Sequence, residues 1–234
     1  MLTLVLTRHG LTDRSIPEQH IGQRLDISIN AAGRRQAETL GRRLARVRFD
    51  RVITSPMHRA RETAALVAPA ITAEADPRIK EMDYGAWEGR TYEEITAEDA
   101  RLRAEWEAAP DITRCPGGET GNEVAARVDR FLTDLLEEQR RWHAKAAFRV
   151  ATGGRAPAEE PEQRVLVVSH ATTNRILLSV ALGVDVRGYR RRFAQGQANI
   201  TVLRWEADGV PSAAKLLLLN DLEHLRVPGE TPWE

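Results

Sequence analysis

Two short apolar stretches, each ending in histidine, decide the expected fold: residues 2–9, LTLVLTRH, and residues 164–170, RVLVVSH. Each stretch is rich in β-branched or aliphatic residues and stops at a polar loop, a pattern that predicts a buried strand. The carboxyl ends of parallel strands meet at one edge of an open α/β sheet, and ligand sites form there. We therefore expect His9 and His170 to lie on the same edge of one sheet.

Strand and helix signals alternate along the rest of the chain. Further strands are expected at 51–54, 199–205 and 214–219, and helices at 31–44 with Asn30 as N-cap, at 58–67 and at 171–182. Short connections between alternating strands and helices are typical of a sheet with helical layers. The sequence predicts an α/β fold, a three-layer sandwich in which helices flank a mostly parallel central sheet.

The middle of the chain has a different character. Thr91 to Glu94 fits a capping box that opens a helix reaching Trp106, a Pro- and Gly-rich loop covers 110–118, and a second helix is expected at 119–139. Two helices between strands indicate an inserted helical cap at about 82–143. Residues 151–163 show no periodicity and predict a flexible loop. We expect one domain, residues 1–234.

The charges are balanced overall but not along the chain. The 234 residues carry 34 Lys and Arg against 34 Asp and Glu; residues 1–65 hold 12 basic and 6 acidic groups, and residues 66–143 hold 10 and 18. This balance argues against a protein that binds nucleic acid or an acidic membrane. A single cysteine, no long apolar run and no leader pattern predict a soluble, cytoplasmic protein without a membrane span.

The residues around the first histidine suit a phosphoryl group. Arg8 precedes His9, and a guanidinium matches phosphate oxygens in a two-pronged contact. Gly10 is expected to let the backbone approach a ligand closely. Arg59, near the start of the helix after the second strand, could supply a second guanidinium.

These residues belong to a larger pattern that resembles the histidine phosphatase superfamily, also called phosphoglycerate mutase-like. Five matching blocks occur in the family's order. The first begins with LTRHGLT at 6–12 and continues through Gly22, Asp26 and GRRQA at 33–37, and the others are SPMHRARETA at 55–64, EMDYGAWEG at 81–89, PGGE at 116–119 and VVSH at 167–170. A short motif such as Arg-His-Gly is weak by itself, whereas five ordered blocks are specific. The resemblance covers residues 2 to about 182 and implies the family's α/β fold.

The resemblance also implies roles. His9 would be the nucleophile that forms a phosphohistidine, and Arg8, Arg59 and His170 would hold the phosphoryl oxygens. Glu81 would be the general acid and then the general base, which requires a partly desolvated carboxyl group. Asp83 and Glu88 are rivals with a solvated or structural role. The remaining phosphate or substrate contacts would be Gly10, Thr12, Ser15, Gly22 and Ala171.

Some positions depart from the family pattern. Ala171 stands where glycine is usual, Ser15 where asparagine is frequent, and Leu11 where glutamate is frequent. The departures at Ser15 and Leu11 affect the expected substrate more than the expected reaction.

Three functions stay open. The first is a metal-independent phosphomonoesterase acting on a small phosphorylated metabolite, and the second is a phosphoglycerate mutase using the same phosphohistidine. The acidic segment after Glu81 favours the phosphatase, and Arg90 and Arg114 are the positions that could reverse this preference. The third is a non-catalytic phospholigand-binding protein, which has little need for a nucleophile together with a proton donor.

The other histidines and the tryptophans are given structural roles. His20, His58, His143 and His224 are expected on the surface, with His224 able to close over the site, and Trp87, Trp106 and Trp142 are expected in the core. No histidine pair has helical metal-ligand spacing and no nucleotide fingerprint is present, so no metal and no cofactor are expected. The partner is a small phosphorylated substrate, and a homodimer is an open alternative.

Overall fold

The computed structural model describes residues 1–151 and 162–226, with side chains up to residue 144 in the first range. Most of the loop expected at about 151–163 lies outside the described residues. Within them a six-stranded sheet forms the centre of the molecule, with the strand order β3-β2-β4-β1-β5-β6. The strands are β1 (Leu2–Arg8), β2 (Arg51–Thr54), β3 (Glu74–Ala75), β4 (Gln163–Ser169), β5 (Ile200–Trp205) and β6 (Lys215–Asp221).

The sheet is mostly parallel, as predicted. β1 pairs in parallel with β4, β4 with β2, and β2 with β3, whereas β5 runs antiparallel to both β1 and β6. Strand β3, which has only two residues, was not predicted from the sequence. Such a short edge strand has no periodicity that a sequence could show.

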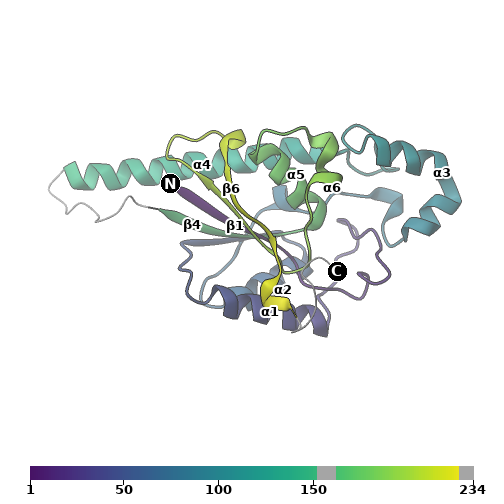
Figure 1. Ribbon diagram of the computed structural model, residues 1–234, viewed down its shortest axis with the longest axis horizontal. Helices are drawn as coiled ribbons and strands as arrows, with labels where there is room; N and C mark the ends of the chain where they lie inside the picture. Colours follow the sequence, from purple (N-terminus) through teal and green to yellow (C-terminus); the bar gives the residue numbers. More distant parts are fainter. Residues whose placement is uncertain (152–161, 227–234) are drawn as a thin grey trace.

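Helices cover both faces of the sheet, which confirms the three-layer fold (Figure 1). Helices α1 (Ala31–Leu44) and α2 (His58–Val67) lie on one face, and α4 (Gly121–Ala151) and α5 (Ala171–Ala181) on the other. Successive side chains of β1 point to opposite faces of the sheet, so the strand contributes to the core under both helical layers. Leu4 and Leu6 belong to the apolar core that includes α4 and α5, while Val5 belongs to the core that includes α1 and α2. Burial on both faces accounts for the unbroken apolar run in β1.

Side-chain caps begin two helices at the predicted residues. The Asn30 side chain accepts a hydrogen bond from the Gly33 amide at 2.9 Å. At the start of the cap helix α3 (Tyr92–Ala108), Thr91 and Glu94 exchange both hydrogen bonds of a capping box. The expected continuous helix is interrupted, because Asp99 has a non-helical backbone and its carboxylate accepts from the Leu102 amide. The capping carboxylate starts a second helical segment there.

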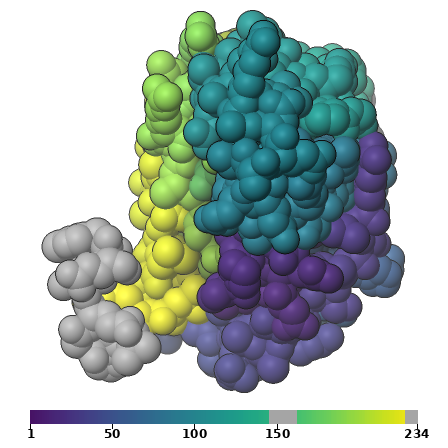
Figure 2. Space-filling view, turned by 90° about the vertical axis from the view of Figure 1, so that its right-hand side faces the viewer, coloured from purple at the N-terminus to yellow at the C-terminus, as the bar shows by residue number. Residues whose placement is uncertain are grey.

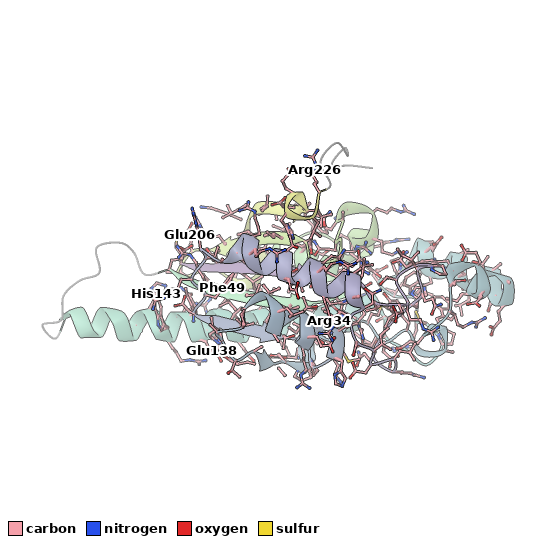
Figure 3. All side chains as sticks on the ribbon, turned by 90° about the horizontal axis from the view of Figure 1, so that it is seen from below. Arg34, Phe49, Glu138, His143, Glu206 and Arg226 are labelled. Carbon is pink, nitrogen blue, oxygen red and sulfur yellow. The ribbon has the colours of Figure 1, made fainter. Side chains whose placement is uncertain are left out.

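The second helix of the segment expected to form the cap packs on the sheet. One face of α4 contributes Val124, Val128 and Leu132 to the core that contains Leu4 and Leu6. Farther along α4, Glu138 (labelled in Figure 3) forms an ion pair with Arg51 of β2 at 2.5 Å. The cap helix α3 instead lies at one end of the molecule, beyond the carboxyl end of β1 (Figure 1).

The end of α4 extends past the core. Trp142 was expected to be buried, but its exposed fraction is 38%, so that prediction was wrong. His143, on the next position of α4 (Figure 3), is half-buried beside the chain's amino terminus, which lies 2.9 Å from its Nε2. In the described part of the chain, no helix combines the length and apolar character needed to span a bilayer.

Candidate active site

The two strand-end histidines meet at one edge of the sheet, as predicted. β1 and β4 are adjacent parallel strands in which Arg8 is opposite Ser169, and the His9 amide donates to the Ser169 carbonyl at 3.0 Å. The ring centroids of His9 and His170 are 5.2 Å apart, with the rings tilted by 61°. Strand pairing therefore fixes both imidazoles at neighbouring positions.

His9 is buried and held in one tautomer. Its Nδ1 lies 2.8 Å from the Gly10 carbonyl oxygen, which can only accept, so Nδ1 carries the proton and Nε2 keeps its lone pair. Burial, followed by the positive charges of Arg59 and Arg8, lowers the pKa of His9 well below its usual value. The ring is therefore neutral near pH 7, the form in which Nε2 is nucleophilic.

Gly10 also has a packing role. A Cβ at this position would lie 2.5 Å from the carbonyl oxygen of Gly33 in α1, so glycine is required for the contact between two backbone segments. The Gly10 amide donates to Thr63 Oγ1 of α2 at 3.1 Å, and the Leu11 amide donates to Gln36 Oε1 of α1 at 3.0 Å. Two helices thus fix the loop that carries His9.

Arg59 is fully buried, although a residue near a helix start is often exposed. Its guanidinium donates to the carbonyl oxygens of Leu25 at 3.1 Å and Gly22 at 2.7 Å. Gly22 therefore contributes to the site by accepting a hydrogen bond from Arg59. Burial is the largest cause that lowers the Arg59 pKa.

Glu88 shapes the loop that holds Arg59. Its carboxylate accepts hydrogen bonds from the backbone amides of Gln23, Arg24 and Leu25 at 2.8–3.1 Å. Asp83 accepts from the Gly85 amide and forms an ion pair with Arg24. Both rivals of Glu81 thus make structural contacts.

Arg8 is anchored by a segment that the sequence analysis overlooked. Its Nη1 donates to the Gln195 carbonyl at 3.0 Å, and its backbone amide donates to Asn199 Oδ1 at 3.1 Å. Burial lowers the Arg8 pKa. The sequence offered one signal for this contact, the amide side chains of Gln195 and Asn199 just before β5. Amide groups that become buried need hydrogen-bond partners.

His170 contacts a second overlooked residue. Its Nε2 lies 2.8 Å from the Oγ of Ser55, which directly follows β2, and both residues are fully buried. Burial, then Arg59 and His9, lowers the pKa of His170 well below its usual value. Ser55 was visible in the sequence as part of a family block, but nothing in the pattern indicated this contact.

Three buried nitrogen atoms at this edge have no hydrogen-bond partner among the described residues: Arg8 Nε, Arg59 Nε and His170 Nδ1. Buried polar atoms are normally paired, so a cluster of unpaired nitrogens needs an explanation. Two belong to guanidinium groups held near a neutral imidazole. An anion with several oxygens, such as a phosphoryl group, would satisfy them.

Glu81 precedes the cap segment in the chain, and its side chain contacts the first residues of α5. It is buried, with an exposed fraction of 5%. Its Oε1 accepts from the amides of Met82 at 2.9 Å and Thr173 at 3.0 Å, and its Oε2 accepts from the Thr172 amide at 3.1 Å. These bonds fix the carboxyl group in the wall of the cavity that also contains His9.

A cavity at this edge of the sheet contains Arg8, His9 and Glu81 in its wall. Its wall consists of Arg8, His9, Arg14, Ser15, Glu18, Gln19, His20, Ile21, Glu81, Tyr84, Tyr92, Ala171, Thr172, Arg175 and Arg190. Of the expected contacts, Ser15 and Ala171 line it, and Thr12 supports Ser15 through a 3.1 Å contact between hydroxyl oxygens. Gly10, Gly22, Arg59 and His170 are not part of this wall.

The cap segment and the loop after β1 both contribute to the cavity wall, and they contact each other. Figure 2 looks onto this end and shows the teal cap segment against the darkest purple, N-terminal segment. The His20 amide donates to the Arg90 carbonyl at 3.0 Å, and the Gly89 amide donates to the His20 carbonyl at 2.8 Å.

His20 was expected on the surface, and this prediction was wrong. It is 4% exposed, and its ring lies 4.4 Å from that of Tyr84 and 4.8 Å from that of Tyr92. Burial, with the positive charges of Arg103 and Arg190, lowers the pKa of His20 to about 3. The aromatic residues that bury it come from the cap, which local sequence around His20 cannot indicate.

The remaining histidines differ in exposure. His58 is exposed, as expected, whereas His224 is half-buried with its Nε2 3.0 Å from the Ala198 carbonyl oxygen. His224 is not part of the cavity wall. Trp87 and Trp106 are buried, as predicted. Within residues 1–151 and 162–226, no three His, Cys, Asp or Glu side chains cluster in a way that could hold a metal ion.

Relatives of known sequence share most of this chain. It is 30% identical over 207 residues to a glucosyl-3-phosphoglycerate phosphatase of Mycobacterium tuberculosis, covering 86% of this chain and 84% of the relative. It is 27% identical to a probable phosphoglycerate mutase of an Enterobacter species, covering 97% of both chains. A bifunctional protein of M. tuberculosis is 32% identical over 95% of this chain, but the chain spans only 54% of that relative's length.

Solved structures share the fold. The Bacillus stearothermophilus protein YhfR superposes with a TM-score of 0.80 at 24% identity, covering 97% of this chain and 100% of that one. The structure of a mycobacterial glucosyl-3-phosphoglycerate phosphatase gives a TM-score of 0.77 at 25% identity, covering 93% of this chain and 98% of that one. The family model of the histidine phosphatase superfamily, branch 1, matches residues 4–216. The chain belongs to the histidine phosphatase superfamily.

Proposed function

We propose that the protein is a metal-independent phosphomonoesterase that works through a phosphohistidine at His9. The observation that carries the proposal is the neutral His9 ring with its Nε2 lone pair available, beside the unpaired nitrogens of Arg8, Arg59 and His170. Glu81 lies in the wall of the same cavity. A nucleophile, oxyanion donors and a carboxyl group at one sheet edge together support phosphoryl transfer.

In the first step, His9 Nε2 attacks phosphorus and forms an N–P bond. The bond between phosphorus and the ester oxygen breaks, its electron pair goes to that oxygen, and Glu81 supplies the proton that makes the leaving alcohol. Arg8, Arg59 and His170 would hold the non-bridging oxygens as charge redistributes in the transition state. The fixed Nδ1–H contact to Gly10 stabilises the positive character that develops on the ring.

In the second step, water attacks the phosphohistidine. Glu81, now a carboxylate, accepts a proton from that water, the N–P bond breaks and its electron pair returns to His9 Nε2. Inorganic phosphate and a protonated Glu81 result. The enzyme is then ready for another ester, so the cycle needs no external cofactor.

The contacts of two cap arginines support the phosphatase over a phosphoglycerate mutase. A mutase would need basic cap residues that bind its substrate, and Arg90 and Arg114 were the candidates. Arg90 pairs with Glu98, Arg114 pairs with Glu123, and neither residue lines the cavity. Several relatives carry phosphatase names, including a phosphoserine phosphatase of Hydrogenobacter thermophilus. The mutase remains the second candidate because other relatives are named as probable phosphoglycerate mutases.

Phosphate release from a panel of phosphomonoesters tests this proposal. We expect turnover by the wild-type protein in the presence of a chelator and its loss in His9→Ala. Chelator-sensitive turnover, or turnover that survives His9→Ala, would overturn the mechanism. Phosphoglycerate mutase turnover that exceeds phosphate release would favour the mutase, and phospholigand binding without either activity would favour a binding protein.

We also propose a cytoplasmic homodimer that forms through the edge strand β6. Leu216, Leu217, Leu218 and Leu219 are 37–48% exposed, and β6 is the last strand of the sheet. In an antiparallel pairing of two β6 strands centred on Leu218, Lys215 would oppose Asp221 of the second copy. Light scattering tests this proposal. We expect the wild-type protein to be a dimer and Leu217→Lys to be a monomer, and a monomeric wild-type protein would refute it.

A further inference from the structure

Three arginines that the proposed reaction does not use line the same cavity as His9. Arg14 comes from the loop after β1, Arg175 from α5, and Arg190 from α6 (Tyr189–Arg192). Within residues 1–151 and 162–226, none of them has a carboxylate at ion-pair distance. This separates them from the cap arginines Arg90 and Arg114, which pair with Glu98 and Glu123.

Each of the three is held by contacts that leave donors available. The Arg190 guanidinium lies over the Trp106 ring, 4.6 Å from its centroid, and 5.8 Å from the centroid of Tyr92. Arg175 Nε donates to the Phe193 carbonyl at 3.0 Å, and Arg14 Nη1 donates to Gln19 Oε1 at 3.1 Å. Stacking and single hydrogen bonds orient a guanidinium without neutralising it.

The charge of the cavity wall exceeds what one phosphoryl group needs. Four arginines line the wall and only two glutamates, Glu18 and Glu81, oppose them. Arg8, supported by the buried Arg59, is assigned to the phosphoryl group. The positive charge of the other three arginines is therefore left for a different part of the ligand.

We propose that Arg14, Arg175 and Arg190 form a second anion subsite, which binds a carboxylate or a second phosphate carried by the alcohol portion of the substrate. This inference rests on the proposed phosphatase function and names its substrate class. The substrate is a phosphomonoester of an anionic alcohol, such as a phosphorylated hydroxy acid or a bisphosphate. A guanidinium matches the paired oxygens of both anions, so the subsite recognises their shared chemistry.

Two matched substrate pairs test the subsite. In the first pair, 3-phosphoglycerate is compared with glycerol 3-phosphate, which has a hydroxymethyl group in place of the carboxylate. In the second, fructose 1,6-bisphosphate is compared with fructose 6-phosphate. We expect the wild-type protein to have the higher kcat/KM for the anionic member of at least one pair, and that pair identifies the anion as carboxylate or phosphate.

The variants are Arg190→Met and Arg175→Met, with Arg191→Met as the control. Arg191 is the exposed neighbour of Arg190 and is not in the cavity wall. We expect Arg190→Met to lower the ratio of kcat/KM between the anionic and neutral members by about 10- to 100-fold, the effect of losing one charge-assisted hydrogen bond. Arg191→Met should keep the wild-type ratio. Arg175→Met provides a second test if thermal unfolding shows that Arg190→Met is not folded.

The outcomes separate the inference from the proposed function. The inference is overturned if the wild-type protein prefers neither anionic member, if both cavity variants keep the wild-type ratio, or if Arg191→Met lowers it equally. The proposed function itself fails if the wild-type protein releases no phosphate from any of the four esters. Turnover with an unchanged ratio therefore rejects only the subsite.

Discussion

Replacing Glu81 by glutamine tests whether its carboxyl group transfers a proton. The side chain keeps its size, but one oxygen becomes an amide NH₂ group. Glu81 Oε1 accepts from two backbone amides, those of Met82 and Thr173, while Oε2 accepts from that of Thr172. The better orientation of the glutamine keeps its oxygen toward the two amides and places NH₂ against the Thr172 amide, 3.1 Å away in the parent protein.

This arrangement has a cost in stability and a separate cost in catalysis. One buried donor loses its acceptor, which should lower the free energy of unfolding by about 1–3 kcal/mol. Losing the general acid should lower kcat/KM for an alkyl phosphate by about 100- to 10,000-fold. An ester such as 4-nitrophenyl phosphate has a leaving group that needs little protonation, so its kcat/KM should fall much less.

The assay compares kcat/KM for glycerol 3-phosphate and 4-nitrophenyl phosphate, because kcat/KM reports the steps up to transfer of the phosphoryl group to His9. Asp83→Asn is the control, since Asp83 lies two residues away and is not part of the cavity wall. Chemical denaturation checks that Glu81→Gln is folded. Equal losses for both esters in a folded variant would refute proton transfer by Glu81 and leave it a positioning role.

Three further predictions follow from buried contacts. Gly10→Ala should destabilise the protein by about 1–3 kcal/mol in urea unfolding, because its Cβ would meet the Gly33 carbonyl at 2.5 Å; unchanged stability would contradict this packing. The pKa of His20 is about 3 in the folded protein, so the unfolded chain gains a proton first as the pH falls below about 6.5. Between pH 6.5 and 5 the wild-type protein should lose about 1.6 kcal/mol more stability than His20→Phe, and equal losses would refute this. At pH 6, ¹H–¹⁵N NMR should show a neutral His9 ring protonated on Nδ1, since its pKa is lowered well below the usual value; a charged ring or an Nε2–H tautomer would contradict the assignment.

Periodicity and local capping predicted most of the fold. The apolar run of β1 indicated a strand buried on both faces, and Thr91 with Glu94 marked the start of the cap helix. The kink at Asp99 escaped notice because a helical pattern does not show where a carboxylate will cap a new segment. Periodicity identified the apolar face of α4. It could not show that this face packs against the sheet, because that depends on where the helix lies in the folded chain.

The site was predictable where strand ends carry the chemistry. His9 and His170 could be placed together because both follow parallel strands. His20 could not be placed correctly, since aromatic residues about 65 to 85 positions away bury it. Arg175 and Arg190 were also missed as cavity residues. They come from helices after β4 and enter the cavity wall only through tertiary packing.

The central claim is that His9 carries the phosphoryl group during turnover. Rapid quenching in alkali of the enzyme mixed with a ³²P-labelled phosphomonoester, followed by peptide mapping, tests it most directly. We expect an alkali-stable, acid-labile label on the peptide that contains His9, and no label in His9→Ala. Turnover without a labelled peptide, or a label on any other residue, would contradict it.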